Sequence, residues 1–188
     1  MQANYLTCKV QAKLRPRGSG RREPKLEQLM TNSKIEFESF IKAHWSLEDK
    51  ANAEAALTFV QQIMNDHNFD AIRERFNGKN YKQHNRNMAD GIEGVIKTMS
   101  DLVKNAPEFS YDVKHVFVDG THVILHSHAT LKAAHRGDDS KGMNIIDTWK
   151  VEDGELVEHW DAVQGIGMDM RLYSLFAGGK VRNTNGVF

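Results

Sequence analysis

The residues best suited to chemistry lie near the end of the chain, in the stretch GELVEHWDAVQ (residues 154–164). His159 and Asp161 are two positions apart there, so a pleated strand would point both side chains to one face. Asp147 lies in the preceding apolar run, IIDTWKV. Such a wall could exchange protons with a substrate, because burial raises the pKa of a carboxyl group. The same pattern also fits a polar pair on an exposed sheet face.

The register of these two strands decides which side chains face each other. A two-residue turn at Asp153-Gly154 would place Asp147 opposite Trp160 and turn the two aspartates to opposite faces. A three-residue turn that begins at Glu152 would pair Asp147 with His159. We favour the three-residue turn, because the opposite face then suits surface or a subunit contact. It predicts one wall formed by Ile145, Asp147, Trp149, Val157, His159, Asp161 and Val163.

Three further histidines are candidates, His126 and His128 in LHSH and His84 in YKQHN. His126 and His128 project to the same side of their own strand. With Gly120 they begin a G-x5-H-x-H pattern typical of cupin metal sites, but the remaining ligands of that pattern are missing. We therefore predict no metal ion and assign these histidines to the structure or to a pocket lining. His84 would either cap a strand end or reach a cavity mouth.

Helices are expected first along the chain. Apolar residues recur at spacings of three and four from Ser46 to Met64 and over residues 91–104, which predicts two amphipathic helices. Ser46 with Asp49, and Asp90 with Glu93, have the spacing of capping residues. Two shorter helices are expected over residues 34–43 and 68–76.

Strands follow, because the apolar period changes to two after Pro107. A strand-like piece at residues 81–85 precedes four strands at residues 109–118, 121–133, 143–151 and 154–164. Asp-Gly pairs at Asp119 and Asp153 are strong hairpin signals, so these four strands should form an antiparallel meander. Helices followed by a long meander predict an α+β domain, a curved antiparallel sheet covered by the N-terminal helices with a cavity between them.

Composition excludes several function classes. A length of 188 residues, 40% of them hydrophobic, suits one domain with a sizeable core. A formal net charge of zero gives no drive towards nucleic acid or an anionic membrane. Cys8 is the only cysteine, and no apolar run approaches the roughly 20 residues of a membrane-spanning helix. We expect a soluble, cytoplasmic protein without nucleic-acid or membrane partners.

Residues 1–29 differ from the remainder by being basic and rich in proline and glycine. We favour a disordered or misassigned extension, with Met30 as an alternative start, over a transit peptide or a basic nucleic-acid-binding arm. A single domain would then occupy residues 30–188.

Five short motifs together resemble a known family. They are YKQHN (81–85), ADGIEG (89–94), VILHSH (123–128), IDTWKVEDG (146–154) and VEHWDAVQ (157–164). In this order they closely resemble the SnoaL-like polyketide cyclase group of the NTF2-like superfamily. The ending NTNGVF (183–188) resembles the predicted aldol-condensation-catalysing branch of that group, and the resemblance covers residues 51–188.

The resemblance implies a cone-shaped α+β barrel that is commonly a homodimer, and an enzyme that uses no metal or organic cofactor. An aspartate on the last strand of such cyclases takes a proton from a carbon next to a carbonyl, and Asp161 resembles it. The preceding strand usually supplies a histidine, where this chain has Asp147. Two carboxyl groups in one cavity could share a proton. His126 would then be the oxyanion partner, and the substrate would be bound by His84, Asn85, His128, Trp149 and His159.

The expected function is therefore proton abstraction next to a carbonyl in a small carbonyl or polyketide-like substrate, as in aldol condensation or cyclisation. Isomerase, dehydratase or hydrolase chemistry is an alternative within the same superfamily. A non-catalytic ligand-binding or dimerisation module is another, because a fold does not fix a function.

Overall fold

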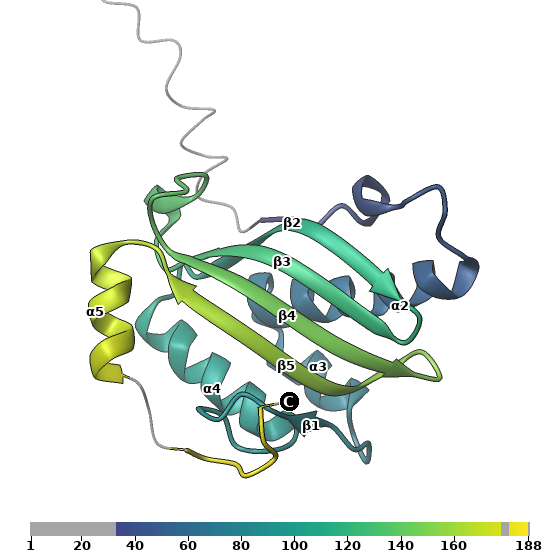
Figure 1. The fold of residues 1–188 in the computed structure, drawn as a ribbon. Helices are drawn as coiled ribbons and strands as arrows, with labels where there is room; N and C mark the ends of the chain where they lie inside the picture. Colours follow the sequence, from purple (N-terminus) through teal and green to yellow (C-terminus); the bar gives the residue numbers. More distant parts are fainter. Residues whose placement is uncertain (1–32, 178–180, 188) are drawn as a thin grey trace, which may run out of the picture.

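A curved five-stranded sheet and the helices that cover one of its faces form the body of the protein (Figure 1). The structure is a computed structural model that describes residues 33–177 and 181–187. The predicted extension at residues 1–29 lies outside the described residues. The strands lie in the order β1-β5-β4-β3-β2. Among the described residues, no helix has the length and apolar composition needed to cross a membrane.

The first helices agree with the apolar periodicity. They are η1 (Phe37–Phe40, a 3-10 turn), α2 (Leu47–Val60), η2 (Gln61–Asn65, a π-helical turn), α3 (Phe69–Arg75) and α4 (Ile92–Asn105). Ser46 Oγ accepts from the Asp49 amide, and the Asp49 carboxylate accepts from the Ser46 amide, which confirms the predicted capping box. The helix expected over residues 34–43 is reduced to η1.

Asp90 does not cap α4 as predicted. Gly91 takes the N-cap position with a φ of 78°, and no side chain caps the helix. The Asp90 carboxylate instead accepts from the backbone amides of Gln83 and Gly91. This aspartate therefore ties the start of α4 to the strand before it.

The predicted meander is present, and a short parallel strand extends it. The strands are β1 (Lys82–Gln83), β2 (Ser110–Asp119), β3 (His122–Thr130), β4 (Met143–Glu152) and β5 (Glu155–Gly165), with a 3-10 turn η3 (Ala133–His135) between β3 and β4. The strands β2 to β5 pair antiparallel in sequence order. β1 pairs parallel with β5, so the sheet is mixed rather than purely antiparallel.

The hairpin between β4 and β5 corrects both registers considered above. Glu152 pairs with Glu155, and Asp153 and Gly154 have φ values of 51° and 77°, as a two-residue type I′ turn requires. The pairing then shifts, because Val157 is an extra residue on β5 and forms a β-bulge.

The bulge restores the face that the three-residue turn was expected to produce. Asp147 lies opposite Asp161, and Trp149 lies opposite His159. The predicted turn was wrong, but the predicted wall is retained except at Val157, which lines a pocket elsewhere on the surface.

An aromatic cluster closes one end of the space between sheet and helices. Phe59 on α2 contacts Phe76, Tyr81 and Trp149 at ring-centroid distances of 5.6, 6.3 and 6.0 Å. Trp149 is fully buried, and its Nε1 donates to the Tyr81 hydroxyl at 3.1 Å. Because this hydrogen bond satisfies Nε1, its only polar side-chain atom, Trp149 can be fully buried at this end of the core.

Two C-terminal elements were not predicted. Helix α5 (Met168–Ala177) follows β5, and residues 181–187 return to β1, where the described chain ends (Figure 1). These elements border the two ends of the wall that carries Asp147 and Asp161.

The register of β4 and β5 can be tested by cross-linking. In a Cys8→Ser background, Ile146→Cys with Ala162→Cys should form a disulfide on mild oxidation, because the two positions are direct cross-strand partners. Ile146→Cys with Gln164→Cys is the control and should cross-link at least about tenfold more slowly, because diagonal partners lie about 7–8 Å apart. Mass spectrometry of the non-reduced protein measures both, and equal yields would contradict the register.

Candidate active site

A cavity of about 530 Å³ lies between the sheet and α4. Most of its lining is apolar and comes from methionine, leucine, isoleucine, valine and phenylalanine side chains. Polar side chains gather where β1, β4 and β5 meet, and no lysine or arginine among the described residues lines the cavity. The polar residues of this wall are Asn85, Asp147, His159 and Asp161. Tyr111 of β2, at the other edge of the sheet, and Thr98, Asp101 and Asn105 of α4 also line the cavity.

Three of these residues form a close cluster. Asp147 is 2% exposed and His159 is 5% exposed, whereas Asp161 is only partly buried. His159 Nε2 lies 3.2 Å from Asp147 Oδ1. One oxygen or nitrogen atom from each residue lies within 4.8 Å of the others. The structure therefore brings together the two carboxyl groups and the histidine that the sequence placed on one wall.

Gln83 determines which nitrogen of His159 carries a proton. Gln83 Oε1 accepts from the backbone amide of Asn85 at 2.7 Å, so this side-chain atom is an oxygen and not the amide nitrogen. The same oxygen lies 3.1 Å from His159 Nδ1. Because an amide oxygen can only accept, the ring proton of His159 must be on Nδ1.

One further proton must then lie between His159 and Asp147. With Nδ1 protonated, the contact of Nε2 with Asp147 Oδ1 is a hydrogen bond only if one of the two atoms donates. Either protonated Asp147 donates to the neutral ring, or the charged ring donates to ionised Asp147. The two residues therefore hold a single proton as a pair.

Burial favours placing that proton on Asp147. Removal from water raises the pKa of its carboxyl group, and the negative charge of Asp161 raises it further. The hydrogen bond and charge of His159 oppose this rise, as does the Tyr111 hydroxyl. The net direction is upward, which suits a carboxyl group that donates a proton near neutral pH.

Asn85 holds the carboxyl group of Asp161 in place. Asn85 Oδ1 accepts from the Asn87 backbone amide at 2.9 Å, so its Nδ2 is the atom that faces Asp161. This nitrogen donates to both carboxylate oxygens of Asp161, at 2.9 and 2.7 Å. These two hydrogen bonds orient the carboxyl group of Asp161, which lines the cavity.

Tyr111 and an unpaired oxygen complete the polar wall. Burial raises the pKa of Tyr111 well above its usual value, and the charges of Asp147 and Asp161 add to this rise, so its phenol keeps its proton. Asp147 Oδ2 is buried and makes no well-formed hydrogen bond to a described residue, although the Tyr111 hydroxyl lies near enough to stabilise the carboxylate. An unpaired buried acceptor is costly, and a bound ligand that donates or shares a proton there would relieve the cost.

The same cluster could hold a divalent metal ion. Asp147, His159 and Asp161 supply two carboxylates and one imidazole, which suit a transition metal ion. The bond from His159 Nδ1 to Gln83 is also the outer-shell bond that metal-bound histidines usually make. A metal ion and a shared proton would compete for the same nitrogen lone pair.

His126 and His128 do not reach this cluster, which corrects the prediction that they serve it. Both lie on the opposite face of β3, because Leu125 and Ser127 pair with Asp147 and Ile145 on the cavity side. His126 Nε2 contacts Asn144 Oδ1 at 2.6 Å on the outer face. His128 Nε2 donates to the backbone oxygen of Lys141 at 2.7 Å and so holds the loop before β4.

His84 and Trp149 also differ from their predicted roles. His84 points to the outer face, where its Nε2 contacts Glu158 Oε1 at 2.7 Å and its ring stacks on Trp160 at 4.7 Å. Trp149 lies beneath the cavity wall and supports it, since its ring stacks on His159 at a centroid distance of 4.7 Å. Of the predicted site residues, Asn85, Asp147, His159 and Asp161 line the cavity.

Sequence reasoning missed Gln83 and Tyr111. A signal for Gln83 was present in YKQHN, because a strand points residues 81, 83 and 85 to one side. His84 and Asn85 therefore could not both face the cavity. Tyr111 lies two positions after Phe109 in a predicted strand, on the face that carries the apolar residues.

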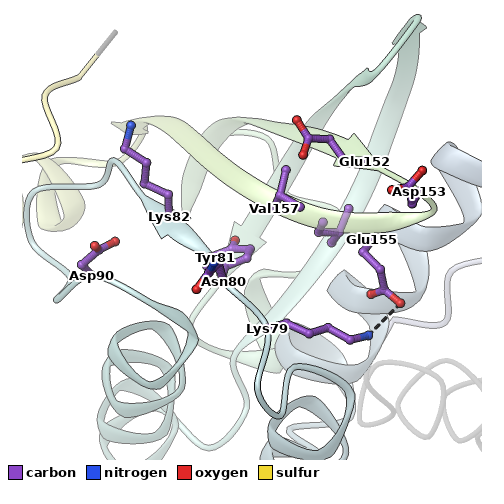
Figure 2. Close-up of a pocket in the computed structure, with 10 residues that line it drawn as sticks. Lys79, Asn80, Tyr81, Lys82, Asp90, Glu152, Asp153, Glu155 and Val157 are labelled. Atoms are coloured by element: carbon purple, nitrogen blue, oxygen red, sulfur yellow. Dashed lines mark ion pairs between the residues drawn. The ribbon is translucent and has the colours of Figure 1, made fainter.

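A second, larger hollow of about 680 Å³ lies on the surface beside β1 and the turn between β4 and β5 (Figure 2). Its two lysines are already paired, Lys79 with Glu155 at 2.7 Å and Lys82 with Glu158 at 3.1 Å. Asp147, His159 and Asp161 are absent from its described lining. We therefore place the candidate active site in the buried cavity.

Fold and site together define an NTF2-like α+β protein, in which a curved sheet and covering helices enclose an acidic cavity. The SnoaL-like polyketide cyclase family matches residues 54–170, and the chain belongs to this family. No curated protein matches the chain in the corresponding sequence comparison.

Solved structures share the fold. A candidate polyketide cyclase from Bacillus cereus ATCC 10987 is 20% identical, covers 61% of this chain and 75% of its own, and has a TM-score of 0.52. A candidate SnoaL-like polyketide cyclase from Jannaschia sp. CCS1 is 16% identical over 76% of this chain and 99% of its own, with a TM-score of 0.50. AclR, a candidate hydroxylase from Streptomyces galilaeus, is 15% identical over 73% and 89%, with a TM-score of 0.51.

The raised pKa of Asp147 predicts how stability depends on pH. The folded state binds this proton more tightly than the unfolded state, so the stabilisation is complete at acid pH and is lost as pH rises through the folded-state pKa. Asparagine never ionises. As pH increases from the unfolded-state pKa to the folded-state pKa of Asp147, the unsubstituted protein loses this stabilisation and Asp147→Asn does not. The free energy of unfolding of Asp147→Asn, relative to that of the unsubstituted protein, should therefore rise by about 1.4 kcal/mol per pH unit in this range.

Urea titrations from pH 4 to pH 9 measure this difference. Asp119→Asn, at the exposed last residue of β2, is the control and should show no such slope. A stability difference for Asp147→Asn that does not change with pH would show that Asp147 titrates like an exposed carboxyl group.

Proposed function

We propose that this SnoaL-like protein is an enzyme that abstracts a proton next to a carbonyl group. Asp161 is the base, and the Asp147–His159 pair is the proton donor. The observation that carries the proposal is the fixed state of the three groups. Gln83 fixes the tautomer of His159, and Asn85 holds Asp161 as an acceptor. A base and an acid therefore lie side by side in one cavity.

The cavity supports a neutral and largely apolar substrate. Its apolar lining would bury hydrocarbon, and the His159, Asp147 and Asp161 side chains lie together on the sheet wall. A free carboxylate or phosphate would meet three aspartates, Asp101, Asp147 and Asp161, and, among the described lining residues, no cation. We therefore propose a small carbonyl or polyketide-like compound without a buried negative charge.

The proposed reaction conserves all atoms of the substrate. Asp161 takes a proton from the carbon next to a carbonyl, and the electron pair of that bond forms the enolate. The enolate carbon attacks a second carbonyl of the same molecule, which forms one carbon–carbon bond and leaves an alkoxide. The Asp147–His159 pair gives its proton to this oxygen, and the proton on Asp161 returns to the pair through solvent. The product is a cyclic isomer of the substrate.

No metal or organic cofactor is needed for this sequence of steps. The proton held between Asp147 and His159 neutralises the developing oxyanion, which is the task that a metal ion would otherwise perform. An isomerase would use the same base and donor but return the proton to another carbon of the same molecule. A binding module could hold a ligand against the same polar wall but would not exchange the protons of a substrate with solvent.

We also propose that the protein is a homodimer through the outer face of the sheet. Phe117 and Ile146 lie on that face and are 56% and 36% exposed. Neighbouring outward positions add Ile124 and Trp160. Apolar side chains gathered on one sheet face are typical of subunit contacts.

Charge placed on this face should separate the subunits. Phe117→Lys with Ile146→Lys should convert a dimer into a monomer, because each lysine would have to be buried at the contact. Sedimentation velocity at several concentrations gives the mass. Lys104→Glu on the exposed end of α4 is the control. A monomeric unsubstituted protein, or a doubly substituted dimer, would exclude this interface.

Loss of the base should abolish proton abstraction. Benzylacetone is a neutral ketone that fits an apolar cavity, and its deuterium uptake in D₂O can be followed by ¹H NMR. Asp161→Asn should reduce the enzyme-dependent rate by at least about 100-fold, the usual contribution of general-base catalysis. Because asparagine can still accept from Asn85, the melting temperature should change little.

Two controls accompany this measurement. Asp119→Asn should keep the full exchange rate, because Asp119 is outside the cavity. Treatment with EDTA followed by dialysis should also leave the rate unchanged. Exchange that survives in Asp161→Asn would exclude Asp161 as the base. If activity is lost with EDTA and restored by one divalent metal, the site binds a metal ion in place of the shared proton, and the metal-free mechanism is wrong.

A further inference from the structure

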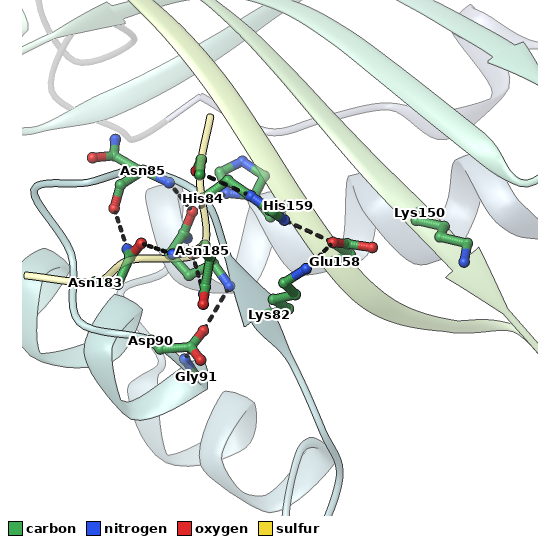
Figure 3. Close-up of polar contacts among 12 residues, drawn as sticks. Lys82, His84, Asn85, Asp90, Gly91, Lys150, Glu158, His159, Asn183 and Asn185 are labelled. Carbon is green, nitrogen blue, oxygen red and sulfur yellow. Dashed lines mark hydrogen bonds and ion pairs between the residues drawn. The ribbon is translucent and has the colours of Figure 1, made fainter. Parts of the chain in front are cut away.

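The C-terminal segment, residues 181–187, lies against the chain that follows β1 (Figure 3). Asn183 Nδ2 donates to the backbone oxygens of Asn85 and Met88, both at 2.9 Å. Asn185 Nδ2 donates to the backbone oxygen of Gln83 at 2.8 Å. The segment thus contacts the two residues whose side chains orient His159 and Asp161.

The two asparagines are held in the orientation that these bonds require. Asn183 is buried, and its Oδ1 accepts from the Asn185 backbone amide at 3.2 Å. Its Nδ2 must therefore face the carbonyl oxygens of the chain after β1. A further backbone bond, from the Arg182 amide to the Arg86 oxygen at 2.8 Å, keeps the two segments side by side.

Gln83 is held by its backbone from two sides. Its amide donates to Asp90 Oδ1 at 2.9 Å, and its carbonyl accepts from Asn185. Partial burial raises the pKa of Asp90, but hydrogen bonds from the amides of Gln83 and Gly91 and from Asn185 outweigh this and lower it. Asp90 is therefore an ionised acceptor, and the backbone of Gln83 is fixed where its side chain meets His159.

His84 anchors the same piece of chain on the other face of the sheet. Its Nδ1 lies 3.2 Å from the Gly186 oxygen, and its Nε2 lies 2.7 Å from Glu158 Oε1. Both ring nitrogens thus face acceptors, one in the C-terminal segment and one on β5. The C-terminal segment therefore contacts Gln83, His84 and Asn85, whose side chains lie on both faces of the sheet (Figure 3).

Strand β1 needs this support because it is very short. It pairs with β5 at Lys82 and Gln83 alone among the described residues, with one further backbone bond from the His84 amide to the His159 oxygen at 3.0 Å. A two-residue edge strand is marginal without other contacts. Its position, and with it the 3.1 Å contact between Gln83 and His159, depends on what holds its backbone.

We propose that the C-terminal segment is a positioning element of the active site. Asn183 and Asn185 hold the chain from Gln83 to Asn85 so that Gln83 keeps His159 in its Nδ1-protonated form and Asn85 keeps Asp161 in place. The effect on turnover rests on the proposed function, whereas the effect on the protonation of His159 does not. Asn183 and Asn185 contact neither the cavity nor the reacting groups, so their role is positioning and not catalysis.

The experiment removes one amide at a time. Asn185→Leu and Asn183→Leu keep the side-chain size but lose the donor, and Thr184→Ala is the control, because Thr184 is exposed between them. With side-chain ¹⁵N NMR, His159 in the unsubstituted protein and in Thr184→Ala should show one protonated Nδ1. The two leucine variants should show averaged nitrogen signals, because the ring is free to change tautomer.

Exchange of deuterium into benzylacetone gives the second reading. We expect kcat to fall by about 10-fold to 100-fold in the leucine variants, because small misplacements of reacting groups cost that much, while KM changes little. A merely structural role would lower the melting temperature and leave the His159 signals as they are. His159 signals like those of the unsubstituted protein in both folded leucine variants would overturn the proposal.

Two outcomes need separate treatment. Should a leucine variant fail to fold, Asn185→Ser gives the same reading, because serine is too short to reach the Gln83 oxygen. Should the unsubstituted protein show no exchange, the proposed function fails but the NMR comparison still decides whether the segment positions His159. Normal exchange in Asn185→Ser together with an unchanged His159 would also reject the positioning role.

Discussion

A single amide oxygen determines the chemical state of the candidate active site. Gln83 Oε1 accepts from the Asn85 backbone and from His159 Nδ1, and it can do nothing but accept. The ring of His159 therefore offers Nε2 to Asp147, and one proton must lie between them. Without this oxygen either tautomer of His159 would be allowed, and the pair would have no defined direction for proton transfer.

The surroundings of that oxygen explain several features of the fold. The parallel strand β1 brings Gln83 level with His159, and the bulge at Val157 brings Asp161 level with Asp147. The fully buried Trp149 supports the His159 ring from below. On the cavity side, apolar walls keep water from the pair, and burial raises the pKa of Asp147. The proton transfer that we propose depends on sheet geometry as much as on the acidic residues.

The two faces of the sheet have separate roles. The inner face carries the acids, Gln83 and His159, whereas the outer face carries the other strand histidines together with exposed apolar side chains. This division fits one surface for chemistry and one for a subunit contact. Membership of the SnoaL-like polyketide cyclase family gives the class of fold. Solved relatives with the same fold are assigned as cyclases in two cases and as a hydroxylase in a third, so the reaction has to be argued from the cavity itself.

The sequence by itself determined helices α2, α3 and α4, the meander, the capping box at Ser46 and the shared face of Asp147, His159 and Asp161, but not α5 or the C-terminal segment. These features follow from local rules, because the periodicity of apolar residues and the type of turn residue depend only on residues close to one another in the sequence. The tertiary structure alone decided the register of that wall, since one bulged residue at Val157 shifts every later pair. It also decided which histidines face inward and that Gln83 and the C-terminal asparagines support the site. These contacts join residues 76 to 102 positions apart, and no local pattern specifies which distant backbone a side chain will meet.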